Sequence, residues 1–209
     1  MTSRPNPAEH TPADAQVRPA VIGLLLAAGL GTRFDPTGRQ SKLLATLPDG
    51  LPVVAHAARA LQQAVDAVVA TVAPGSNPAL EHTLQSLGIT LVECTDARLG
   101  MGHSVACGIR ATQPSTGWLI ALGDMPFVLP ATCRRLAGAL RDGHDIVVPV
   151  HDAQRGNPVA FSTKWRQTLE QLSGDRGARA LLQRQDAYRL AVSDPGILRD
   201  IDHPGDLPA

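Results

Sequence analysis

Short apolar runs alternate with longer segments of helical period along the chain. The run "AVIGLLLA" at 20–27 is rich in branched residues and predicts a strand buried on both faces. Similar runs predict further strands at 66–73, 89–94, 117–122, 145–150, 157–162, 188–193 and 198–201. Apolar residues three and four apart predict helices at 52–65, 77–88, 103–112, 129–143, 163–174 and 175–185. This alternation indicates an α/β protein with three layers, α/β/α, and a mainly parallel sheet.

Polar, glycine-rich segments follow most of the predicted strands. In a mainly parallel sheet, ligands bind at the carboxyl ends of the strands, so these segments meet at one edge. We therefore expect a single site there. The segments, in chain order, are "AAGLGTR", "TDARLGMGHS", "GDMP", "HDAQRGNP" and "DHPGDL".

The first of these loops is suited to hold an anion. Gly29 and Gly31 let backbone amides approach a ligand closely, and Thr32 and Arg33 follow where a helical turn is expected to begin. Two ligands fit such a loop: a dinucleotide, or the triphosphate of a nucleotide. Phe34 stands where a dinucleotide-binding turn requires its third glycine, and no G-K-[ST] of a Walker loop follows. The triphosphate is favoured, because Arg33 and Lys42 add charge-assisted contacts.

Carboxylates are expected at the same edge. Asp124, in "GDMP", comes directly after the predicted strand at 117–122. Asp200 and Asp202 alternate in "LRDIDHPGDL" and share one face if that segment is extended. Magnesium prefers one or two carboxylates together with substrate phosphates. We therefore predict Asp124 and Asp202 as ligands of Mg²⁺.

Composition narrows the class of protein. Lys plus Arg equals Asp plus Glu, at 19 each, and only 3% of residues are aromatic, so a nucleic-acid binder is disfavoured. No apolar segment approaches the ~20 residues of a membrane span. The polar, Pro-rich residues 1–18 lack a signal-peptide core and predict a disordered tail on a cytoplasmic protein, with 19–209 as a single domain. The three cysteines are far apart and are expected to be reduced.

Several motifs together resemble the molybdenum cofactor nucleotidylyltransferases, a MobA-like branch of the nucleotidyltransferases. The first motif, "LAAGLGTRF", is shared with the wider superfamily, whereas "GNPVAF" and "GDRGARALL" resemble the branch that attaches CMP to molybdopterin. The resemblance implies a Rossmann-like, GT-A-like fold over about residues 20–207. The motifs, in chain order, are "LAAGLGTRF", Lys42, "GDMP", "GNP", "GDRGAR" and "IDHPGDL".

This resemblance implies a reaction and a role for each matching residue. The terminal phosphate of molybdopterin, or of its molybdenum-loaded form, would attack the α-phosphorus of a nucleoside triphosphate and release pyrophosphate, with Mg²⁺ as cofactor. Arg33, Lys42 and Asp124 would be catalytic. Nucleotide binding would fall to Leu26, Ala27, Ala28, Gly29, Gly31, Thr32, Arg33, Lys42, Gly102 and Ser104. Acceptor binding would fall to Asn157, Asp175 and Arg179.

Several alternatives stay open at this point. Ala28 stands where guanine-using branches tend to have glycine, which favours CTP; guanylyl transfer to the same cofactor, or cytidylyl transfer to another phosphorylated small molecule, are the alternatives. A non-catalytic cofactor carrier would have no evident use for Lys42 and Asp124. Asp35 and Pro36 stand where the family usually has a glycine, and Lys42 comes later in the sequence than in the family. Arg39 is therefore a candidate to take the role of Lys42. Expected partners are the two small-molecule substrates and a transient contact with a molybdoenzyme or its chaperone, with neither nucleic acid nor membrane.

Overall fold

One sheet contains all the strands in the part of the chain that the structure describes. The computed structural model describes residues 20–29, 31–114, 116–174 and 187–208. The strand order is β3-β2-β1-β4-β7-β5-β6, and β8 pairs with β5. The strands are β1 (Val21–Leu26), β2 (Ala67–Val72), β3 (Thr90–Glu93), β4 (Gly117–Leu122), β5 (Ile146–His151), β6 (Gln154–Arg155), β7 (Val159–Ser162) and β8 (Tyr188–Ala191).

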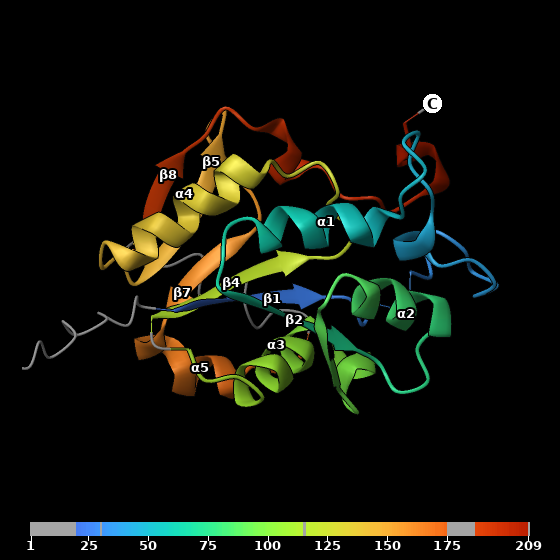
Figure 1. Cartoon of the computed structure of the whole chain (residues 1–209), viewed down its shortest axis with the longest axis horizontal. Helices are drawn as coiled ribbons and strands as arrows, with labels where there is room; N and C mark the ends of the chain where they lie inside the picture. Colours follow the sequence, from blue (N-terminus) through green and yellow to red (C-terminus); the bar gives the residue numbers. More distant parts are fainter. Residues whose placement is uncertain (1–19, 30, 115, 175–186, 209) are drawn as a thin grey trace, which may run out of the picture.

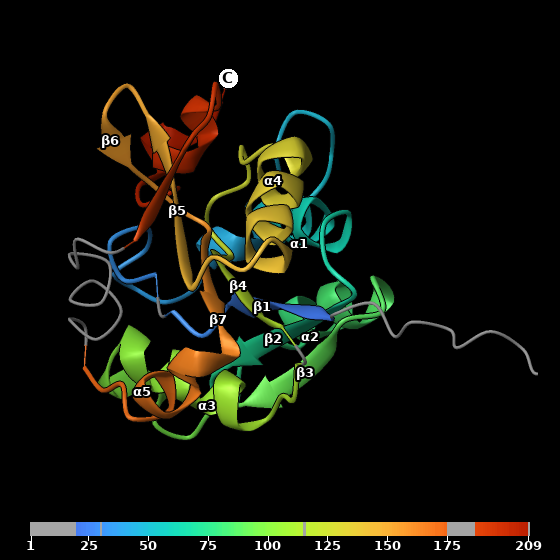
Figure 2. The same ribbon diagram turned by 90° about the vertical axis from the view of Figure 1, so that its left-hand side faces the viewer.

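Helices cover both faces of this sheet. Figure 1 shows α1 and α4 on one side and α3 and α5 on the other, and Figure 2 shows the same separation after a quarter turn. The α-helices are α1 (Val53–Gln62), α2 (Pro78–Ser86), α3 (Met101–Arg110), α4 (Pro130–Arg141) and α5 (Arg166–Glu170). Short 3-10 turns are η1 (Lys42–Leu44), η2 (Ala97–Leu99), η3 (Thr163–Trp165), η4 (Pro195–Leu198) and η5 (Pro204–Asp206).

The sheet is mainly parallel, which confirms the expected architecture. The strand β1 runs parallel to β2 and β4, β3 runs parallel to β2, and β8 runs parallel to β5. The strand β7 is antiparallel to β4 and to β5, with Ile120 opposite Val159. Because β7 runs backwards, its beginning lies at the edge where β1 and β4 end. The segment before β7, which carries "GNP", is therefore brought to the predicted ligand edge.

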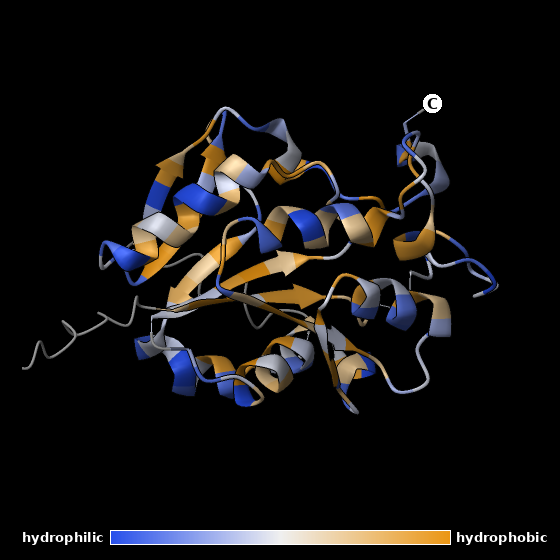
Figure 3. Ribbon diagram, in the orientation of Figure 1, coloured by the Kyte–Doolittle hydropathy of each residue, from blue (hydrophilic) through white to orange (hydrophobic). Residues whose placement is uncertain are grey.

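The central strands supply the core of both layers. Leu24 and Leu25 of β1 are fully buried, and they belong to clusters on opposite faces of the sheet. Leu24 packs with Val105 of α3, whereas Leu25 packs in the cluster of Val54 of α1. Figure 3 accordingly shows a hydrophobic sheet between helices whose residues alternate in hydropathy. The apolar run at 20–27 thus predicts a strand buried on both faces correctly.

Two elements predicted in the C-terminal part of the chain differ from the structure. Residues 198–201 do not form a strand: Leu198 ends η4 (Pro195–Leu198), and residues 199–201 are irregular. The Asp194 side chain accepts a hydrogen bond from the Gly196 backbone N–H, and proline at the first position of the turn favours it. The helix predicted at 163–174 is limited to η3 and α5 and ends at Glu170. The helix predicted at 175–185 and the tail at 1–18 lie outside the described residues.

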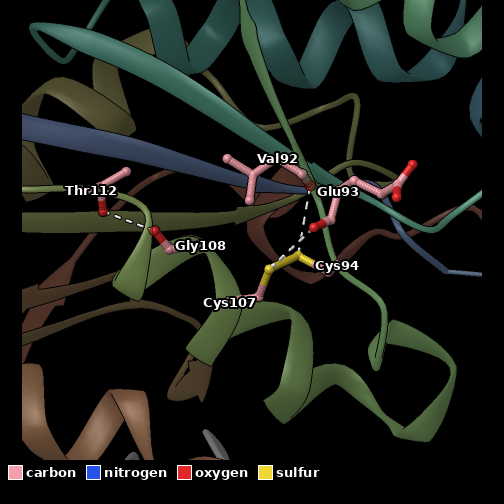
Figure 4. The surroundings of a disulfide bond; sticks show 6 residues. All are labelled: Val92, Glu93, Cys94, Cys107, Gly108 and Thr112. Atoms are coloured by element: carbon pink, nitrogen blue, oxygen red, sulfur yellow. Dashed lines mark hydrogen bonds between the residues drawn. A yellow bond between two sulfur atoms is a disulfide. The ribbon is translucent and has the colours of Figure 1, made fainter.

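The prediction that all three cysteines are reduced is wrong for two of them. Cys94, just after β3, forms a disulfide with Cys107 of α3, with Cα atoms 5.9 Å apart. Figure 4 shows the bridge between the end of β3 and the helix, with the sulfur atoms near the carbonyl oxygens of Val92 and Glu93. Packing of α3 beside β3 brings the two residues together, which sequence spacing does not reveal. The disulfide also removes one support for a cytoplasmic location.

The third cysteine, Cys133 of α4, is free and buried, so only this residue keeps the expected reduced state. Within the described ranges, every helix is too short or too polar to cross a bilayer.

Candidate active site

A cavity of about 480 Å³ opens where β1 and β4 end. Its walls come from the loop after β1, from η1, from the start of α3 and from the C-terminal segment. The lining includes ten residues predicted from sequence: Leu26, Ala28, Gly29, Gly31, Thr32, Arg33, Lys42, Ser104, Asp124 and Asp202. It also includes residues without a predicted role, among them Arg98, Gly100, Met101 and Asp200.

The loop after β1 is shaped by a glycine and held by an aromatic anchor. Gly31 has a φ of 62°, a left-handed conformation that disfavours other residues. Its carbonyl accepts hydrogen bonds from the backbone N–H groups of Phe34 and Asp35, which closes the turn. Phe34 is buried with Leu47 and Ile201, so its ring fixes the far side of the loop. The residue that argues against a dinucleotide turn therefore positions this loop.

Lys42 binds two carboxylates at the centre of the cavity. Its ammonium Nζ lies 2.5 Å from Asp124 Oδ2 and 2.9 Å from Asp202 Oδ1, and its side chain is only 11% exposed. Burial would lower the pKa of Lys42, but the hydrogen bonds and charges of the two aspartates outweigh burial and raise that pKa above its ordinary value. Lys42 is therefore a permanent cation, and the longer loop does not keep it from the site.

A backbone contact brings Asp202 beside Asp124. The N–H of Ile201 donates to the carbonyl of Asp124 at 2.8 Å, and the Ile201 side chain is fully buried. Figure 1 shows this C-terminal segment beside the loops that follow β1. Asp206, an exposed residue of η5, accepts hydrogen bonds from the N–H groups of Asp202 and His203 through one oxygen. Asp206 therefore orients the backbone that carries Asp202; the sequence signal for this role is its position three residues after His203, as in a capping box.

Arg33 adds a second cation to Asp202. Its guanidinium lies 2.5 Å from Asp202 Oδ2, while its side chain is 70% exposed at the mouth of the cavity. Burial would raise the pKa of Asp202, but Lys42 and then Arg33 lower it below its ordinary value. Asp202 is therefore ionised at neutral pH, and Arg33 remains accessible to an incoming anion.

Three carboxylates could hold a divalent metal here. Asp124, Asp200 and Asp202 each offer an oxygen within 4.8 Å of the others. The Oδ1 atom of Asp124 is buried and has no hydrogen-bond partner among the described residues, so it has free ligating capacity. Hard carboxylate oxygens suit Mg²⁺ or Mn²⁺. Asp200 belongs to the alternating D-x-D pattern, but that pattern alone does not assign it a role.

The remaining predicted residues lie at the margins of the cavity or away from it. Ala27 is buried behind the loop, where its N–H donates to the Thr71 carbonyl. The Gly102 N–H donates to the Gly174 carbonyl at 2.8 Å, and a side chain at Gly102 would collide with residues 173–174. Gly102 therefore packs the start of α3, whereas Ser104, two residues later, faces the cavity.

Asn157, the one described residue among those predicted to bind the acceptor, is separate from this lining. The Asn157 N–H donates to the Ile197 carbonyl at 3.0 Å, and the residue lies at a small second cavity together with Met125. Asp175 and Arg179 lie outside the described residues. Their role in acceptor binding stays a prediction.

Comparison with known proteins identifies related sequences. The MobA-like NTP transferase domain matches residues 23–188. The molybdenum cofactor cytidylyltransferase of Escherichia coli K12 is 26% identical over 188 residues, covering 90% of this chain and 94% of that protein. The bifunctional protein GlmU of Geotalea daltonii is 29% identical over 115 residues, covering 54% of this chain but only 24% of GlmU.

A solved structure also aligns over nearly the whole chain. Rv0371c of Mycobacterium tuberculosis H37Rv, in complex with manganese, has a TM-score of 0.74 and 28% identity, and the alignment covers 90% of this chain and 95% of that one. A divalent metal therefore binds to a relative with the same fold, which is consistent with the acidic cluster.

Proposed function

Because the chain belongs to the MobA-like NTP transferase family, we propose that it transfers CMP from CTP to the terminal phosphate of molybdopterin or the molybdenum cofactor. The observation that carries the proposal is the cluster in which Lys42 meets Asp124 and Asp202 below a glycine loop. Such a cluster suits the phosphates of a metal-bound nucleotide, and a carrier protein would not need it. The substrates are two small molecules, and the expected site of action is the cytoplasm.

The proposed reaction requires positioning and charge neutralisation, with no protein nucleophile. An oxygen of the acceptor phosphate attacks the α-phosphorus of CTP; the new P–O bond forms as the bond to the β-phosphate oxygen breaks, and pyrophosphate leaves. Amides of Gly29 to Arg33 and the Arg33 guanidinium would bind the β- and γ-phosphates. Lys42 would neutralise charge that develops at the α-phosphate. Asp124 and Asp202 would hold Mg²⁺, which supplies further charge neutralisation when bound.

Support for CTP over GTP comes from two sources. Ala28 lines the cavity, and its methyl group occupies space that a glycine would leave open. The E. coli cytidylyltransferase also matches nearly end to end. GTP with the same acceptor is the second candidate, and a cytidylyl transfer to another phosphorylated small molecule is the third.

A single assay decides which nucleotide is used with this acceptor. Purified protein with MgCl₂ and molybdopterin is mixed with CTP, GTP, ATP or UTP, and pyrophosphate release and the dinucleotide product are followed. We expect turnover with CTP. Product with GTP alone would overturn the cytidylyl assignment, and tight pterin binding without turnover would favour a carrier.

Replacement of Asp124 tests the proposed metal ligand. We expect Asp124→Asn to lower kcat by at least about 100-fold, because a neutral amide replaces a charged oxygen ligand. The matched control is Asp145→Asn, at a carboxylate that pairs with Lys164 at the surface outside the cavity, and it should leave kcat unchanged. A rate for Asp124→Asn equal to that of the control would remove Asp124 from the site.

A further inference from the structure

The ammonium of Lys42 lies where a divalent ion would have to bind. Its Nζ contacts one oxygen of Asp124 and one of Asp202, the two half-buried members of the three-carboxylate cluster. With only 11% of its side chain exposed, Lys42 fills the space between these carboxylates. A metal on the same two carboxylates, with Nζ still within hydrogen-bond distance of them, would place two cations close together in a low-dielectric site.

We propose that Lys42 is the internal counter-ion of the metal-free protein, and that it leaves Asp124 and Asp202 for the phosphates when a metal-bound nucleotide enters. The inference rests on the proposed nucleotidyl transfer and adds an exchange of cations to it. Lys42 then has two positions: between the carboxylates in the empty protein, and against the triphosphate in the complex.

The surroundings of Lys42 allow this exchange by rotation of one side chain. Lys42 begins η1, and its Cγ lies 3.4 Å from the point where a Cβ on Gly31 would be. The stem of Lys42 therefore runs along the phosphate-binding loop, and only its tip reaches the carboxylates. A turn of the flexible four-carbon stem carries Nζ from one set of anions to the other without moving the backbone.

Arg33 keeps Asp202 paired during the exchange through Nη1, which leaves the other N–H groups of its guanidinium for the phosphates. It contacts Oδ2 of Asp202, whereas Lys42 contacts Oδ1. The carboxylate that Lys42 leaves is thus still oriented by a second cation. Asp124 has its Oδ1, which has no hydrogen-bond partner in the described part of the chain, in addition to the oxygen that Lys42 releases. Both ligands are therefore ready for the metal.

The test measures binding of Mn²⁺ alone, by electron paramagnetic resonance of free Mn²⁺, with no nucleotide and no turnover. We expect Lys42→Met to bind Mn²⁺ at least about tenfold more tightly than the unmodified protein, because the competing cation is gone. Lys42→Arg keeps the charge and should bind Mn²⁺ as weakly as the unmodified protein. Lys42→Gln is a second neutral variant and should match Lys42→Met; circular dichroism checks that each variant is folded.

Lys164→Met is the matched control. Lys164 forms an ion pair with Asp145 at the surface, with its side chain 74% exposed, so its removal changes the net charge equally but leaves the cluster intact. Its Mn²⁺ affinity should be unchanged. With CTP present, the order should reverse, and Lys42→Met should bind Mn²⁺–CTP at least about tenfold more weakly than the control variant, because the triphosphate loses a cation.

Two results would overturn the proposal. One is an Mn²⁺ affinity of Lys42→Met and Lys42→Gln no higher than that of Lys164→Met. The other is an equal gain in Lys42→Arg. Failure of the proposed transfer is a separate outcome: if the neutral variants bind Mn²⁺ more tightly and Mn²⁺–CTP more weakly, but no triphosphate supports turnover, the cation exchange stands and the reaction assignment falls.

Discussion

Cys133 shows how burial controls the chemistry of a single residue. It lies on the buried face of α4. Burial, together with the nearby Asp194 carboxylate, raises the pKa of its thiol to about 12. The thiolate is the reactive form, so at pH 8 only about one thiol in ten thousand is ionised. Cys94 and Cys107 are held in a disulfide.

The folded protein should therefore resist alkylation. We expect iodoacetamide at pH 8 to leave the native protein unlabelled by mass spectrometry. The same reagent should add three groups after denaturation and reduction, because the chain has three cysteines. Rapid single labelling at Cys133 in the native protein would contradict the assignment.

The sequence predicts those site residues whose role follows from the residues next to them in the chain. Arg33 follows its glycines, and Asp124 follows its strand, so local sequence is enough to place both. Asp206 has a local signal too, its capping position three residues after His203, but that signal does not connect it with Asp202 and the site. Asp200 joins the carboxylate cluster only because the Ile201 N–H binds the Asp124 carbonyl and aligns the two segments. The role of a residue such as Asp200, which depends on a contact between distant segments, is thus not predictable from the sequence.

At the scale of elements, the disulfide fastens one wall of the cavity. It joins the end of β3 to α3 and encloses the segment that contains η2. Within that segment, Ala97, Arg98 and Gly100 line the cavity. A disulfide between residues 13 positions apart reduces the number of conformations open to the unfolded chain. Disulfides of that span stabilise proteins by about 3 kcal/mol.

Loss of the bridge should be measurable in urea. We expect Cys94→Ser with Cys107→Ser to lower the free energy of unfolding by about 2–3 kcal/mol. Unmodified protein in reducing agent should show the same loss, while reducing agent should not affect the double variant. Equal stability of the bridged protein and the double variant would show that the disulfide does not constrain the fold.

Elements with a clear period are predictable, and those made by turns are not. Buried strands such as β1 and β4 follow from apolar runs, and α2 from Asn77 and the proline after it. The strand β6 escapes prediction because Asp152 and Ala153 adopt φ values of 47° and 62° to close a two-residue hairpin, with no Asn-Gly signal. The segment at 198–201 has apolar residues only at its two ends, Leu198 and Ile201, and Ile201 serves as a buried anchor for the site instead of as part of a strand.

At the scale of the whole molecule, the site joins distant parts of one sheet. Loops after β1 and β4, the start of α3 and the C-terminal segment all contribute to the cavity. A ligand that binds only this assembled arrangement stabilises the complete fold, by about 2.7 kcal/mol at a concentration of 100 Kd. The sheet order that creates the site, with β7 reversed, is not encoded in any local pattern.

Ligand binding should accordingly raise the melting temperature of the entire chain. We expect Mg²⁺–CTP at about 100 Kd to raise Tm by about 5–10 °C, measured by scanning calorimetry. GTP, ATP and UTP at the same concentration should give smaller shifts, and Asp124→Asn should reduce the CTP shift. Equal shifts with all four nucleotides would contradict selection of the base.

The distance along the chain between Lys42 and Asp202 has a consequence for synthesis. The two partners are 160 residues apart. A ribosome that adds about 5–20 residues per second leaves roughly 8–32 s between them. During that interval the nascent chain already has the glycine loop and Lys42, and later Asp124, but has no second carboxylate. Under the proposed function, the glycine loop is therefore synthesised before the complete metal site, and a metal-bound nucleotide could assist folding only after residue 202 has left the ribosome.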